Sequence, residues 1–401
     1  MRTLFADPFH QDFANLALAA ISVGAADAGE IATVAERTTP GDDESYYAAW
    51  VVAADAVVAG AGSLEPDAAR QAYLRAAVYY SIAWHPFLGP TANDRLTDAF
   101  GRETQALAQA AARFEPALEA VSIPFPGHDM PGYFVPASGH PAGTRRPLLI
   151  CTNGYDASVS AMLVCSALAA SARGHHCLLF DGPGQGAMLI EHGVPLRADW
   201  EVVIRPVVDF ALARADVDPA RVALTGWSLG GYLAPRGASG EHRLAACIAD
   251  PGMPGQADVM RRRLVANGFT ADQAAHLEEL SDDVLSTIVA GGTQTRDGRW
   301  RLEQRGPFVH GVATAAEALR ALEPYSMEGH YEQVTCPTLL TAAENDPLSA
   351  LATDFAQRLG ERGHLMRFTA EEGAGDHCEL LNRPLANERM LDWLDTVLAP
   401  D

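Results

Sequence analysis

The chain of 401 residues contains no lysine, and all of its 29 basic side chains are arginines. Without lysine the protein cannot form a Schiff base with a carbonyl substrate, anchor pyridoxal phosphate or use a lysine as a general base. A glycine-rich loop at 182–186 follows the apolar run 178–180, but it has neither the G-x-G-x-x-G spacing nor the lysine of a phosphate-binding loop. We interpret it as a structural turn in which Asp181 bonds to nearby backbone N–H groups.

Other absences narrow the class of protein. No apolar run reaches the roughly 18 residues of a membrane span, and the N-terminus lacks a signal-peptide pattern, so we expect a cytoplasmic protein without a membrane partner. Several of the six scattered cysteines (Cys151, Cys177 and Cys247) fall in predicted strands, which favours reduced, buried thiols over disulfides or a zinc site. No H-E-x-x-H or comparable spacing occurs, so no metal and no cofactor is expected.

The chain also has few positive charges for its size, and its formal net charge is −22 at pH 7. This charge argues against binding to nucleic acid or to anionic membranes. It identifies no substrate, because a solvated acidic surface that aids solubility accounts for it equally well. We therefore expect a small molecule as the substrate.

The most informative residues present are Gly226-Trp227-Ser228-Leu229-Gly230. They stand between an apolar run at 221–225, which predicts a buried strand, and a segment at 231–234 that can begin a helix. Strand, tight turn with a serine, then helix is the context of a nucleophile elbow. Small residues flank the serine because a Cβ there would clash with the packed strand or helix.

An acid and a histidine follow the serine in the order that such an elbow requires. Asp346 comes just after a predicted strand at 337–342, where open α/β sheets place their chemistry. His377 stands on a glycine-rich loop after a further predicted strand at 364–369. The pattern predicts a Ser228-His377-Asp346 triad. The competing interpretation is a turn serine, a surface aspartate and a capping histidine that never meet.

The run 147–152 predicts a central strand that leads directly into Asn153-Gly154-Tyr155-Asp156. Gly154 would let this backbone approach the serine closely, so we expect the N–H groups of Tyr155 and Leu229 to form an oxyanion hole. The ring of Tyr155 is explained equally well by packing and by substrate contact.

These motifs resemble the α/β-hydrolase superfamily across 147–251, including the Asp-Gly-Pro-Gly-Gln-Gly motif at 181–186. Within it, the stretch 73–80 and the tail 373–379 are similar to serine hydrolases with an N-terminal helical domain. That group includes 2,6-dihydroxypseudooxynicotine hydrolase and the fungal hydrolases that shorten aromatic polyketide (heptaketide) chains. The resemblance implies a mostly parallel sheet with helices on both faces and cleavage of a carbon–carbon bond next to a ketone. Asn153 stands where many relatives have histidine, which leaves the backbone donors in place.

The patterning predicts an N-terminal helical domain at 1–120 and a catalytic domain at 121–401. A cap insertion is expected at 251–333, after the sixth strand. Aromatic stripes on the N-terminal helices predict that these helices pack on the catalytic domain and share in an apolar pocket with the cap. They could also supply the surface of a homodimer.

Five further side chains are candidates for substrate contact: Asp156, Asp250, His85, Trp84 and His310. Either histidine could bind a phenol or a ketone, and the carboxylate at the end of the sixth strand could orient a substrate. The alternative for each is a structural role, as a hydrogen-bonded histidine or a turn-capping aspartate.

The expected chemistry is acyl transfer from a small aromatic or polyketide-like molecule to water through an acyl-enzyme. The resemblance favours hydrolysis of a carbon–carbon bond in a β-diketone or aryl ketone. The same triad would serve a carboxylic ester, thioester or lactone hydrolase. It would also serve an acyltransferase or cyclase of natural-product biosynthesis that excludes water.

Overall fold

The computed structural model describes residues 3–90, 93–141 and 143–399. Met1 and Arg2 of the predicted helical domain and the last two residues of the catalytic domain lie outside this part. An eight-stranded sheet in the order β1-β2-β4-β3-β5-β6-β7-β8 forms the centre of the molecule. The strands are β1 (Glu119–Ile123), β2 (Met130–Val135), β3 (Arg146–Thr152), β4 (His176–Phe180), β5 (Val217–Trp227), β6 (Ala246–Asp250), β7 (Thr338–Ala343) and β8 (Gly363–Phe368).

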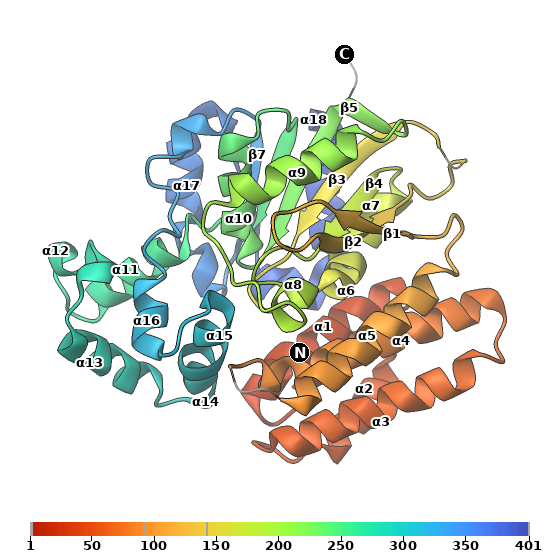
Figure 1. The fold of residues 1–401 in the computed structure, drawn as a ribbon, viewed down its shortest axis with the longest axis horizontal. Coiled ribbons are helices and arrows are strands. Elements are labelled where there is room, and N and C mark those ends of the chain that lie inside the picture. The colour runs from red at the N-terminus through yellow and green to blue at the C-terminus, as the bar shows by residue number, and fades with distance from the viewer. Residues whose placement is uncertain (1–2, 91–92, 142, 400–401) are drawn as a thin grey trace.

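Strands β3 to β8 pair in parallel. At one edge β1 pairs antiparallel with β2, and β2 pairs antiparallel with β4. The central strands β4, β6 and β7 are buried at every position, as continuous apolar runs in a two-sided parallel sheet must be. In Figure 1, α9 and α10 lie in front of this sheet and α18 lies behind it. The predicted α/β-hydrolase fold is confirmed. The sheet-packing helices are α6 (Val159–Met162), α7 (Leu168–Ala172), α8 (Gly186–Ile190), α9 (Trp200–Leu212), α10 (Gly230–Gly240), α17 (Ala352–Leu359) and α18 (Arg383–Val397).

Five helices precede the sheet and pack beside it (Figure 1): α1 (Pro8–Ala20), α2 (Ala28–Arg37), α3 (Asp43–Ala61), α4 (Pro66–Trp84) and α5 (Asp94–Ala111). Asp7, Asp27, Asp42 and Asn93 begin four of them by accepting hydrogen bonds from first-turn N–H groups. The buried side chains of these helices and of the sheet form one continuous apolar core. None of the described helices combines the length and the apolar character needed to cross a membrane.

The segment between β6 and β7 forms a separate group of short helices beside the sheet (Figure 1). It has a second, small apolar core of its own, centred on Leu264, Leu277 and Leu285. Its helices are α11 (Gln256–Ala266), α12 (Ala271–Ala274), α13 (Asp282–Gly292), α14 (Arg296–Arg299), α15 (Gly306–His310) and α16 (Ala315–Arg320). We call this segment the cap; its boundaries as a functional unit stay a prediction.

Candidate active site

Ser228 occupies a strained turn between β5 and α10. Its φ is +59°, in the left-handed region that residues other than glycine seldom adopt. The flanking glycines make this turn feasible, because a Cβ on Gly226 would lie 1.9 Å from the carbonyl oxygen of Gly230. A Cβ on Gly231 would lie 1.9 Å from the carbonyl oxygen of Pro251. The N–H of Ser228 donates to the carbonyl oxygen of Asp250 at 2.7 Å, which ties the turn to the end of β6.

The structure brings Ser228, His377 and Asp346 into one hydrogen-bonded chain. His377 Nε2 lies 2.9 Å from Ser228 Oγ, and His377 Nδ1 lies 2.7 Å from Asp346 Oδ2. The Asp346 side chain is only 1% exposed and its Oδ1 accepts from the N–H of Leu348 at 2.9 Å, so its orientation is set from both oxygens. The His377 side chain is 40% exposed and remains open to a ligand.

The electrostatics at His377 favour the protonated ring. Although part of the His377 side chain is exposed, the protein packed around the imidazole removes water from it, and this by itself lowers the pKa of His377. The charge and hydrogen bond of Asp346, with smaller contributions from Asp250 and Asp156, outweigh burial and leave this pKa above its ordinary value. A raised pKa makes the imidazole a stronger base toward the serine hydroxyl.

The loop after β3 lies directly against the serine. A Cβ on Gly154 would be 2.8 Å from Ser228 Cβ and 3.3 Å from Ser228 Oγ, so only glycine permits this approach. Among the turn, loop and cap hydrogen bonds of the described residues, none is donated by the N–H of Tyr155 or of Leu229. Both of these N–H groups are therefore free for a ligand oxygen.

Side chains of the cap hold the two residues that follow Gly154. Arg305 Nη1 lies 2.8 Å from Asp156 Oδ2, and its guanidinium lies 4.3 Å from the centroid of the Tyr155 ring. The Tyr155 hydroxyl bonds to His310 Nε2. Burial, and secondly the charge of Arg305, lower the pKa of His310 to about 4, so the ring is neutral at pH 7, and its Nε2 accepts from the Tyr155 hydroxyl in the tautomer that carries the proton on Nδ1. The candidate contacts Asp156 and His310 thus join the cap to the loop beside the serine.

His85 and Trp84 are buried under the same loop. Their rings stack at 4.2 Å, and His85 Nδ1 lies 2.5 Å from the carbonyl oxygen of Ser81. Trp84 Nε1 donates to Glu103 at 2.7 Å, and Glu103 also accepts from the Ser158 hydroxyl. Trp84 Nε1 and His85 Nδ1 are thus bonded within the protein, and substrate contact by either residue stays a prediction.

The Asp250 carboxylate lies in a buried network with partners far away in sequence. Arg383 Nη1 is 2.5 Å from Asp250 Oδ2, the Thr341 hydroxyl donates to Oδ1 at 2.9 Å, and both ion-pair side chains are at most 3% exposed. Arg383 also donates to the carbonyl oxygen of Cys378, beside His377. Sequence reasoning missed Arg383, because no local motif marks an arginine that pairs across the fold.

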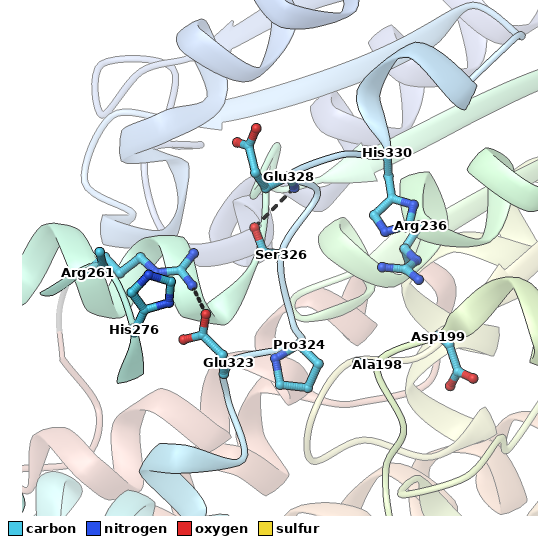
Figure 2. A pocket seen from close by; sticks show the side chains of 11 residues that line it. Ala198, Asp199, Arg236, Arg261, His276, Glu323, Pro324, Ser326, Glu328 and His330 are labelled. Atoms are coloured by element: carbon cyan, nitrogen blue, oxygen red, sulfur yellow. Dashed lines mark hydrogen bonds and ion pairs between the residues drawn. The ribbon is translucent and has the colours of Figure 1, made fainter. Parts of the chain in front are cut away.

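A cavity of about 880 Å³ lies between α10 and the cap, and contains none of the triad residues. Figure 2 shows the side chains that line it, among which Arg261 pairs with Glu323. His276, Glu278 and Glu323 place three possible metal-ligand atoms within 4.8 Å of one another here. Glu323 is already occupied by Arg261 and by the N–H of Leu277, so this group does not form an open metal site.

Comparison with known proteins shows hydrolases that are similar to this chain over almost its full length. The chain is 30% identical over 426 residues to the 20-hydroxy-prefusarin hydrolase FUS2 of Gibberella moniliformis, covering 100% of this chain and 99% of that protein. It is 30% identical over 436 residues to hydrolase acrC of Aspergillus aculeatus, covering 97% and 96%. The crystal structure of 2,6-dihydroxy-pseudo-oxynicotine hydrolase superposes with a TM-score of 0.72 at 22% identity and 95% coverage of each chain, which shows a shared fold. A model described as the alpha/beta hydrolase family matches residues 149–387. The chain therefore belongs to the alpha/beta hydrolase family of enzymes.

Proposed function

We propose that the protein is a serine hydrolase in which Ser228 is the nucleophile, His377 the general base and acid, and Asp346 the residue that orients the imidazole. The observation that carries this proposal is the unbroken chain from Ser228 Oγ through both ring nitrogens of His377 to Asp346. The free N–H groups of Tyr155 and Leu229 beside it form the oxyanion hole.

The chemistry follows from these positions. His377 Nε2 takes the proton from Ser228 Oγ as this oxygen attacks the carbonyl carbon of the substrate. The negative charge that develops on the carbonyl oxygen is stabilised by the two backbone donors. When the tetrahedral intermediate collapses, the leaving group takes the electron pair of the broken bond and the proton from His377. Water then attacks the acyl-enzyme with His377 again as base, releasing a carboxylic acid and restoring Ser228.

We propose further that the broken bond joins the carbonyl carbon to a carbon atom of an aromatic or polyketide-like substrate. The leaving carbanion must be stabilised as an enolate or by a phenolic ring, and His377, whose pKa is raised, would hold the proton that it needs. Support comes from the full-length likeness to a 20-hydroxy-prefusarin hydrolase and from the fold shared with a 2,6-dihydroxy-pseudo-oxynicotine hydrolase.

Substitution of the serine tests the triad. Ser228→Ala should abolish turnover and covalent labelling by a fluorophosphonate while the protein stays folded, because alanine fits the turn with one oxygen fewer. Circular dichroism and thermal melting check the fold. Turnover above a tenth of the wild-type rate would remove Ser228 from the nucleophile role.

A matched set of substrates tests the bond. A 2,6-dihydroxyphenyl alkyl ketone, a 1,3-diketone and a phenyl ester of the same acyl group should be compared by kcat/KM, with products identified by mass spectrometry. Carbon–carbon hydrolysis of the aryl ketone in D₂O places one deuterium on the ring carbon that leaves. Turnover of the ester alone would make the protein an esterase. Acyl-enzyme that persists in water until an alcohol or amine is added would make it an acyltransferase.

A further inference from the structure

Gln185 is a buried amide beneath the loop that follows β3. It lies in the Asp-Gly-Pro-Gly-Gln-Gly turn after β4, and it is 1% exposed. Its Nε2 donates to the carbonyl oxygen of Asn153 at 2.8 Å and to that of Gly154 at 3.1 Å. Its Oε1 accepts from the N–H of Gly182 at 3.2 Å, which fixes which end of the amide faces the loop. The polar atoms of this side chain are thus all engaged.

The position of the second hydrogen bond has a geometric consequence. The carbonyl group of Gly154 and the N–H of Tyr155 belong to the same planar, trans peptide unit, so they point in opposite directions. A donor that holds the carbonyl oxygen on one side therefore aims the N–H at the other side. The loop contacts the serine at Gly154, where an added Cβ would lie 2.8 Å from Ser228 Cβ.

We propose that Gln185 is a positioning residue, which aims the N–H of Tyr155 into the oxyanion hole by clamping the carbonyl oxygen of Gly154. This inference rests on the proposed function of the triad. It gives the Asp-Gly-Pro-Gly-Gln-Gly turn a part in catalysis through the loop, beyond the purely structural role expected from the sequence.

A second buried residue of the turn holds the rest of the loop. Asp181 accepts from the side chain of Asn153 at 3.1 Å and from the N–H groups of Val159 and Ala187, each at 3.0 Å. The two ends of the loop are thus anchored by Asp181, whereas only Gln185, among the described side chains, binds the carbonyl of Gly154. Substitution of Gln185 should therefore release the peptide unit between Gly154 and Tyr155, while Asp181 still holds the rest of the loop in place.

The size of the effect follows from the cost of losing an oxyanion donor. Complete loss of one donor lowers kcat by on the order of 10²–10³-fold. A misaligned N–H retains part of its interaction, so we expect kcat to fall by about 10- to 100-fold. Ground-state binding does not use this donor, and KM should stay within about twofold.

Two variants test the inference. Gln185→Met keeps the length of the side chain and removes both donors, and Gln185→Glu keeps the shape and the acceptor toward Gly182. For each variant we would measure kcat, KM and the melting temperature. We would also measure the affinity for the product acid and the affinity for a trifluoromethyl ketone, which forms a tetrahedral adduct with the serine. The expected result is weaker binding of the ketone by the same factor as the loss in kcat, with binding of the acid unchanged.

The glutamate variant adds a pH readout. Its carboxylate repels the two carbonyl oxygens, whereas the protonated acid donates to one of them. Burial favours protonation, so the ratio of variant to wild-type kcat should rise as the pH falls from about 8 to about 6. A purely structural role would leave that ratio flat.

Asn387→Leu is the matched control, because Asn387 is also a buried amide that donates to a carbonyl oxygen, that of Cys165. The Asn387→Leu variant should have a changed melting temperature and an unchanged affinity for the ketone. Equal affinity of the wild type and both Gln185 variants for the ketone, or a loss equal to that of the control, overturns the inference alone. If the wild-type enzyme binds the ketone without forming an adduct at Ser228, both the proposed function and this inference are wrong.

Discussion

At the scale of single residues, the contact between Asp346 and His377 determines the pH range in which His377 is neutral and can act as a base. Burial lowers the pKa of His377, but Asp346 together with Asp250 and Asp156 raises it by more, so the ring keeps its proton at a higher pH than an ordinary histidine. Since the base must be neutral to accept the serine proton, kcat/KM should fall toward acid pH with a midpoint above the ordinary histidine value of about 6.5. A pH–rate profile of the free enzyme measures this midpoint.

Replacement of the acid tests the same contact. Asp346→Asn should lower kcat by about 10⁴-fold, because an amide at this position holds the wrong imidazole tautomer. It should also move the acid midpoint of any residual activity downward, since the charge that raises the pKa of His377 is gone. An unchanged midpoint would show that Asp346 does not act on His377.

Asp250→Asn is the contrasting substitution. It leaves the buried Arg383 guanidinium without its closest carboxylate, which should cost roughly 3–5 kcal/mol of unfolding free energy, less whatever Glu379, 3.7 Å from Arg383, restores. Among folded molecules kcat should change much less than in the Asp346 variant. Denaturant unfolding measures the loss of stability, and kcat measures the loss of activity. If Asp250→Asn lowered kcat more than Asp346→Asn does, the triad acid would be Asp250, at the end of β6.

At the scale of the elements, α14 of the cap is joined to the N-terminal helices by one arginine. Arg296 pairs with Asp7 and Asp43, which stand at the starts of α1 and α3, and its guanidinium lies 4.7 Å from the centroid of the Phe9 ring. Trp300 packs edge-on against the same ring at 5.5 Å. Cap and helices therefore meet through charge and aromatic packing.

From this contact we predict that the local stability of the cap depends on Arg296. Arg296→Gln removes charge-assisted hydrogen bonds and should cost roughly 1–3 kcal/mol in local stability. Amide hydrogen exchange should accelerate in α13 to α16, and KM for bulky substrates should rise more than kcat falls. Arg320→Gln is the control, because Arg320 pairs with Asp282 within the cap. Unchanged exchange in both variants would show that the contact does not hold the cap.

At the scale of the whole molecule, the N-terminal helices share one core with the sheet. Trp84 and Phe100 are buried in this shared core, and Glu103 bonds to Ser158 of the catalytic domain. Removing the helices would expose a broad apolar surface and leave that serine without its partner. Exposed apolar patches above a few hundred Å² are uncommon on soluble monomers.

A chain that starts at Val121 should therefore aggregate or lose activity on bulky substrates. Size-exclusion chromatography with light scattering, followed by kinetics, measures both outcomes. The full chain is the control, and its mass also tests whether the expected homodimer forms. A monodisperse shortened chain with unchanged kinetics on the natural substrate would contradict a role of the helices in the pocket.

The sequence by itself determined the fold class and the chain order of the candidate triad. Both depend on local signals: apolar runs that must be strands, small residues around Ser228 that permit a strained turn, and polar residues placed just after strand ends. Such signals survive in a one-dimensional pattern because strand, turn and helix preferences act over a few residues.

Only the tertiary structure decided which partners the remaining polar side chains take. Asp250 binds Arg383, 133 positions further along the chain, Tyr155 meets His310 from the cap, and Gln185 reaches back to Gly154. No local pattern encodes these pairs, because they form only when β6, the cap and the loop after β4 are packed together. Burial then requires each polar group to find a partner, and the packed neighbours determine which one it finds.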